Sequence, residues 1–148
     1  MNPSFWRLPF AAITWRRLAH VLTGAVLAPV LLIPLLFGWG VRLELARARW
    51  IGAVPGVRPR PALYGLANLA LAVPFGVFFG YLCLLWPYWV SYPVVFWDAD
   101  LAHGTWGGPT RLGAFAVHTS PALVMLFVGP WLLKQAARAH AAVVRRLL

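Results

Sequence analysis

The sequence has few acidic residues and a single cysteine. Only 3 of its 148 residues are Asp or Glu, against 13 Lys or Arg. The lone Cys83 excludes an intramolecular disulfide and a thiolate metal cluster within one chain. A net charge of +10 would suggest nucleic acid as the partner of a soluble domain, but no nucleic-acid-binding signature accompanies the charge. Nucleic acid is therefore not an expected partner.

Catalytic and cofactor motifs are also missing. The sequence contains no HExxH, no GxSxG and no paired carboxylates within a hydrophobic span. The stretch GTWGGP at 104–109 has the glycines of a turn, without the Lys and Ser/Thr of a phosphate-binding loop. We therefore predict that the chain is not an enzyme and that it holds no catalytic, cofactor-binding or metal site.

Charge is absent from one long stretch of the chain. The 37 residues of 61–97 include no Asp, Glu, Lys, Arg or His. About 20 apolar residues in a helix span the roughly 30 Å hydrocarbon core of a bilayer. Only 11% of the chain is charged, against about 25% in ordinary soluble domains. The sequence thus predicts an all-α integral membrane protein that forms one domain over 1–148.

Three hydrophobic segments are expected, at about 18–41, 62–90 and 113–133, before a basic tail at 134–148. The second helix is expected to end near Pro87 and Pro93. The first segment is too short for two helical crossings. It is expected either to re-enter as a hairpin broken by its prolines near 28–34, with both ends inside, or to cross once as a tilted span. Interfacial amphipathic helices are expected in the connector 42–61 and in the tail.

Basic residues predict the orientation. The connector 42–61 and the tail are rich in arginine, whereas the connector 98–111 holds two aspartates and one arginine. The positive-inside rule then places the first two in the cytoplasm and the third outside. We expect a multi-pass protein of the inner (cytoplasmic) membrane with a cytoplasmic C-terminus. The side chains expected to contact lipid or a partner protein are Arg42, Arg47, Arg49, Lys134, Arg138, Arg145 and Arg146.

Aromatic side chains support this placement, because indole rings prefer the headgroup level of a membrane. The expected interfacial anchors are Trp86, Trp89, Trp97, Trp106 and Trp131. His20 and His140 fall near the proposed inner boundaries and are also interpreted as interfacial. Asn68 is expected to hydrogen-bond to a neighbouring helix, and Gly65, Gly76 and Gly80 are expected to allow helices to approach closely.

The polar residues of the outer end are the candidates for a sensing or ligand site. His118 lies in GAFAVHTSP near the start of the third segment, and ionisable groups inside membranes are often functional. With Asp98, Asp100 and His103 it would make a cluster suited to a divalent metal or to a pH response. The spacing matches no ligand motif. A solvated loop, and for His118 a structural hydrogen bond, are the alternatives.

Several stretches of the chain carry a family resemblance: TWRRLAHVL at 14–22, the residues of 31–56 and 61–93, WGGPTRLGAFAVH at 106–118, and 129–148. Together they resemble the membrane sensor domain of actinobacterial two-component histidine kinases and related stand-alone proteins. The family's first hydrophobic region looks longer than the one found here. No kinase domain follows Leu148, so the resemblance implies a stand-alone form that signals through another polypeptide. It implies no defined ligand.

The leading expectation is therefore a non-enzymatic, sensor-like regulatory subunit of the membrane. The alternative is a structural accessory subunit of a larger membrane complex, and a third option is a small transporter component. No cofactor is expected. Membrane lipids and another membrane or membrane-associated protein are the expected partners, and self-association to a homo-oligomer is a further option.

Overall fold

A computed structural model describes residues 4–56, 59–98 and 106–148. Its elements in chain order are the short 3-10 helix η1 (Phe5–Phe10), α1 (Ala12–Leu36), α2 (Val41–Ala48), the 3-10 turn η2 (Arg49–Ile51), α3 (Pro61–Val95) and α4 (Arg111–Leu147). Within the described ranges every regular element is helical, and the all-α class is confirmed.

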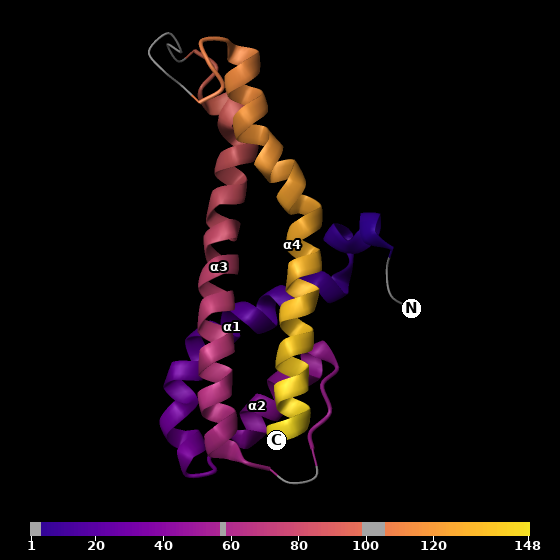
Figure 1. The fold of residues 1–148 in the computed structure, drawn as a ribbon, viewed down its shortest axis with the longest axis vertical. Coiled ribbons are helices and arrows are strands. Elements are labelled where there is room, and N and C mark those ends of the chain that lie inside the picture. The colour runs from indigo at the N-terminus through magenta and orange to yellow at the C-terminus, as the bar shows by residue number, and fades with distance from the viewer. Residues whose placement is uncertain (1–3, 57–58, 99–105) are drawn as a thin grey trace.

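Three of these helices, α1, α3 and α4, are long and apolar enough to cross a membrane. The two longest, α3 and α4, run side by side along the long axis, while α1 crosses them obliquely and α2 lies beside the C-terminal end of α4 (Figure 1). With 35 and 37 residues, α3 and α4 are each about 50–55 Å long, which exceeds the roughly 30 Å hydrocarbon core. The chain has the helices of a multi-pass membrane protein, and parts of α3 and α4 extend beyond the core.

The first hydrophobic segment is one continuous helix, α1, and not a re-entrant hairpin. Residues 28–34 stay helical although Pro29 and Pro34 each lack an amide donor. The chain reverses only after Leu36, where Gly38 and Gly40 have φ angles of +79° and +80°. Glycine adopts this left-handed region without steric cost, so the two glycines allow the sharp turn into α2.

The second helix ends near the expected place, at Val95 and two residues after Pro93, although it continues through both Pro87 and Pro93. A helix that stopped inside lipid would leave several backbone groups unpaired, whereas a proline within the helix frees only one carbonyl. The tail does not form the separate amphipathic helix that the sequence predicts. It is the last part of α4, which is continuous from Arg111 to Leu147.

Small residues bring α1 and α3 together, as the glycines predict. A Cβ atom on Gly76 would overlap the side chain of Ala25, and one on Gly65 would lie 3.3 Å from Cβ of Leu35. Close approach of this kind lets helices gain van der Waals contact where lipid offers no hydrophobic driving force. The C-terminal half of α1 therefore lies against α3.

The connector and the tail pack on one another at the end of the bundle that holds the C-terminus, which we call the connector end. Its buried cluster contains Leu35, Ala48, Ala53, Tyr64, Ala141, Val144 and Leu148. The amide of Arg60 also donates to the carbonyl of Leu147 over 2.7 Å. Residues from 42–61 and from 134–148 therefore share one core.

Candidate functional site

A buried ion pair lies at the connector end, on the inner face of α2. Glu44 is 0% exposed and Arg47 is 4% exposed, and Nη2 of Arg47 donates to Oε2 of Glu44 over 2.7 Å. The two residues are three apart, so they lie on the same side of the helix. Buried charges need partners, because an unpaired one costs several kcal/mol. Leu43 of the same helix and Trp50 of η2 are exposed.

Two polar residues of α3 face this pair. Tyr64 and Asn68 are both 0% exposed and lie one helical turn apart. The hydroxyl of Tyr64 donates to Oε2 of Glu44 over 2.7 Å, and its oxygen lies 3.1 Å from Nε2 of His140. Oδ1 of Asn68 lies 2.8 Å from the same nitrogen. Tyr64 therefore connects the carboxylate of α2 to the imidazole of α4.

Two histidines complete the arrangement. Nε2 of His20 lies 2.7 Å from Nδ1 of His140, although the residues are 120 positions apart in the sequence. Nδ1–H of His20 donates to the backbone carbonyl of Arg47 over 3.1 Å. In return, Nη1 of Arg47 donates to the carbonyl of His20 over 2.8 Å. The exposed fractions of His20 and His140 are 2% and 6%.

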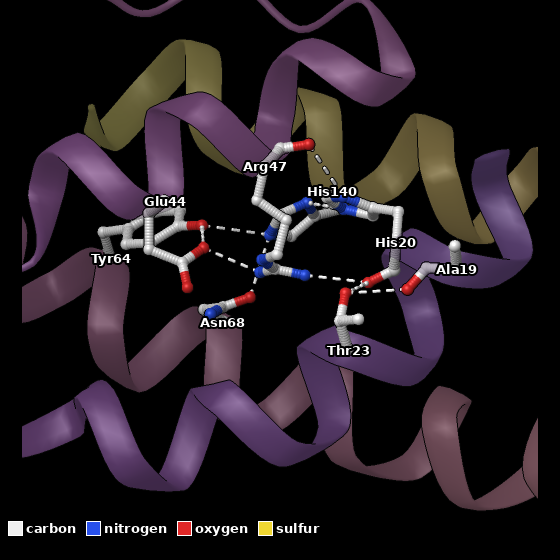
Figure 2. A network of polar contacts seen from close by, with 8 residues as sticks. All are labelled: Ala19, His20, Thr23, Glu44, Arg47, Tyr64, Asn68 and His140. Atoms are coloured by element: carbon white, nitrogen blue, oxygen red, sulfur yellow. Dashed lines mark hydrogen bonds and ion pairs between the residues drawn. The ribbon is translucent and has the colours of Figure 1, made fainter.

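We call these six side chains the connector network: His20, Glu44, Arg47, Tyr64, Asn68 and His140. Figure 2 shows them pointing toward one another between the helices, joined by an unbroken set of hydrogen bonds. One member comes from α1, one from α4, and two each from α2 and α3. The network therefore joins every α-helix of the described chain at one point.

Three buried atoms of the connector network have no hydrogen-bond partner among the described residues. They are Oε1 of Glu44, Nε of Arg47 and Nδ2 of Asn68. A cavity of about 20 Å³ adjoins the network and is lined by His20, Arg47 and His140 together with apolar side chains. This volume holds about one water molecule. The network thus has unused hydrogen-bonding capacity for a solvent-sized species.

Two members of the sensing cluster predicted from the sequence, Asp98 and His118, lie at the opposite end of the bundle from the connector network (Figure 1). Nδ1–H of His118 donates to the carbonyl of Ala114 on its own helix over 2.7 Å, and its ring stacks on Tyr92 with centroids 3.8 Å apart. Asp98 is exposed. Asp100 and His103 lie outside the described residues. The structure therefore gives His118 a structural hydrogen bond and a stacking contact, and it does not bring His118 to the connector network.

The basic residues divide into two groups. Arg42, Arg49, Arg138, Arg145 and Arg146 are exposed and Lys134 is half-buried, which leaves them accessible to lipid or a partner. Arg47 differs from this expectation, because its guanidinium is buried against Glu44. Its three-residue spacing from the only Glu of the chain is the physical reason.

The expected tryptophan anchors are largely at the surface of the protein. Trp106 is 80% exposed, Trp131 is 46% exposed and Trp89 is half-buried. The indole of Trp86 donates to the carbonyl of Ala122 over 3.1 Å. Trp97 stacks on Phe115, and the guanidinium of Arg111 lies 5.5 Å from the Trp97 ring. That contact has the geometry of a cation–π interaction.

The interpretation of His20 and His140 as interfacial is wrong, since both are buried in the connector network. Two local signals could have pointed to four of the six residues of this site. Tyr64 and Asn68 lie one helical turn apart in a stretch without charge, and Glu44 precedes Arg47 by three residues. No local pattern brings the two histidines together, because their contact depends on how α1 and α4 pack.

The chemistry that these groups offer is proton binding and hydrogen-bond exchange. In the part of the chain that the structure describes, no three His, Cys, Asp or Glu side chains are grouped to hold a metal ion. No family model, curated protein or solved structure matches this chain.

Proposed function

We propose that this chain is a non-enzymatic, sensor-like regulatory subunit of the inner membrane, which signals through a separate partner protein. One observation carries the proposal. The connector network bonds α2 of the connector to the tail part of α4, through Tyr64 and the two histidines. A change within the membrane helices thereby has a direct physical route to the basic connector and to the basic tail.

The buried charges favour discrete states over gradual ones. Removing or displacing one member of a buried ion pair leaves the other charge without compensation, at a cost of about 3–5 kcal/mol. Partly broken arrangements of Glu44 and Arg47 are therefore poorly populated. Regulation requires two packings with different affinity for a partner, and a network that is either intact or rearranged is suited to that.

The surfaces that a partner would contact lie at the same end of the molecule. Arg42 and Arg49 of the connector and Arg145 and Arg146 of the tail are exposed. The positive-inside rule favours a cytoplasmic position for this end, where anionic lipid is also available. The resemblance to a stand-alone sensor domain supports the same function.

The test compares two variants that each lose one hydroxyl group. Tyr64→Phe removes the atom that connects Glu44 to His140, whereas Tyr81→Phe makes the same change at a residue of α3 that is 59% exposed. Each tagged variant is purified from native membranes in mild detergent, and co-purifying proteins are quantified by mass spectrometry.

The proposal predicts a sub-stoichiometric partner whose yield with Tyr64→Phe differs at least several-fold from its yield with the wild type and Tyr81→Phe. Equal yields for all three chains would contradict the proposal. A large assembly of fixed stoichiometry that all three chains join would instead identify a structural accessory subunit.

A further inference from the structure

The connector network ends in a hydrogen-bond acceptor on the side of His20. The backbone carbonyl of Arg47 can only accept, so Nδ1 of His20 must carry the proton of their 3.1 Å hydrogen bond. This leaves Nε2 of His20 to face Nδ1 of His140.

The network also ends in acceptors on the side of His140. A carboxylate only accepts, so the hydroxyl proton of Tyr64 is directed to Glu44 over 2.7 Å. The Tyr64 oxygen can then only accept from Nε2 of His140, which lies 3.1 Å away. Oδ1 of Asn68, at 2.8 Å, is an acceptor as well. With the Asn68 amide in this orientation, Nε2 of His140 carries a proton too.

A third proton lies between the two rings. The 2.7 Å contact between Nε2 of His20 and Nδ1 of His140 needs one donor and one acceptor. The four ring nitrogens thus carry three protons, whereas two neutral imidazoles carry two. The arrangement accommodates one proton more than a neutral pair of histidines.

We propose that the connector network is a binding site for a single proton, which His20 and His140 share. The proposal rests on the proposed function and supplies its stimulus, since uptake or release of this proton would set the state of the connector end. The extra proton is shared among Nε2 of His20 and the two ring nitrogens of His140.

The structure also indicates how the site accommodates the loss of the proton. Nδ2 of Asn68 has no partner among the described residues. If Nε2 of His140 loses its proton it becomes an acceptor, and a half-turn of the Asn68 amide brings a donor to it. Proton release is thus coupled to the orientation of one buried amide on α3.

Charged and titratable groups face the histidine pair from α2 and α3. Glu44 and Arg47 face it from α2, and Tyr64 faces it from α3. Arg17 precedes His20 by three residues on α1, and Arg138 precedes His140 by two on α4. A titratable group binds its proton as the pH falls, so the site fills on acidification.

The test is nuclear magnetic resonance of the full chain, labelled with ¹⁵N-histidine, in lipid nanodiscs. Ring ¹⁵N shifts distinguish protonated from unprotonated nitrogens, and His103→Gln and His118→Gln variants assign the remaining two residues. The proposal predicts that the signals of His20 and His140 move together through one midpoint, with uptake of one proton in total.

Two substitutions of Asn68 give opposite expected shifts. Asn68→Asp places a carboxylate beside Nε2 of His140 and should raise the midpoint by about 1–3 pH units. Asn68→Leu removes the acceptor and should lower the midpoint. Two independent protonations that ignore both substitutions would overturn the proposal. So would the absence of any protonation over the whole pH range in which tryptophan fluorescence reports a folded chain.

The outcome of this experiment is independent of the outcome of the partner-capture test. A shared proton combined with partner capture that is the same for wild type and Tyr64→Phe would keep the proton site and overturn the signalling role. Partner capture that depends on Tyr64, without a shared proton, would keep the signalling role and overturn the proton site.

Discussion

The buried ion pair gives the clearest prediction about stability, because removing one charge and removing both should have different consequences. Arg47→Met leaves the fully buried carboxylate of Glu44 without its ion-pair partner. It also removes the donor to the carbonyl of His20. The double variant Glu44→Leu/Arg47→Met replaces both charges with apolar side chains of similar size.

The expected magnitudes follow from these contacts. Breaking a buried pair costs about 3–5 kcal/mol, whereas replacing a whole pair with apolar residues is often neutral or stabilising. The double variant strands little else, because the Tyr64 hydroxyl can donate to Nε2 of His140, 3.1 Å away, once that nitrogen has lost its proton. For a chain of this size we expect Arg47→Met to lower the melting temperature by roughly 6–20 °C, and the double variant to recover most of that loss.

The assay is thermal unfolding in detergent micelles, followed by the fluorescence of the chain's 9 tryptophans and by circular dichroism. Arg42→Gln is the control, since Arg42 is exposed on the same helix and should change stability by less than about 0.5 kcal/mol. The reasoning is refuted if Arg47→Met is as mild as Arg42→Gln, or if the double variant is less stable than Arg47→Met.

Two further predictions concern the frame that holds the network. Gly76→Ala should destabilise the chain by about 1–3 kcal/mol, because its Cβ would overlap Ala25, whereas Gly129→Ala has no atom within 4 Å of its Cβ and should not; equal unfolding midpoints would contradict the close α1–α3 packing. Thr110→Ala should cost about 0.5–2 kcal/mol, because Oγ1 of Thr110 accepts from the amide of Gly113 at the start of α4 over 3.1 Å. Thr110→Ser should keep most of that stability, and a serine variant as unstable as the alanine variant would count against the cap.

The sequence was sufficient for the class of the protein because lipid leaves little choice. A charge-free stretch as long as 61–97 has to be helical, since every backbone group inside a bilayer must be paired within its own segment. The same constraint favours a helix that continues through Pro87 and Pro93, as α3 does before it ends at Val95.

The site was less predictable because its parts come from four helices. The polar residues Asp98, Asp100, His103 and His118 stood out in the sequence, as ionisable groups near a membrane do. The buried site is built instead from His20, His140 and the connector pair Glu44 and Arg47. Each of these has an ordinary local context, within a helix or among arginines. Only the packing of α1 and α4 brings the histidines together, and periodicity along one helix carries no information about that packing.

The most direct test of the account is a double-mutant cycle across the connector network, which joins α2 to the tail of α4. The variants are Glu44→Gln, His140→Gln and the two combined, with unfolding free energies measured in micelles. Because Tyr64 bonds to both residues, we predict a coupling energy of about 0.5–3 kcal/mol. A control cycle that pairs the exposed Arg42→Gln with His140→Gln should be additive. Additivity in the Glu44–His140 cycle as well, to within about 0.5 kcal/mol, would contradict the claim that this network holds the connector to the tail.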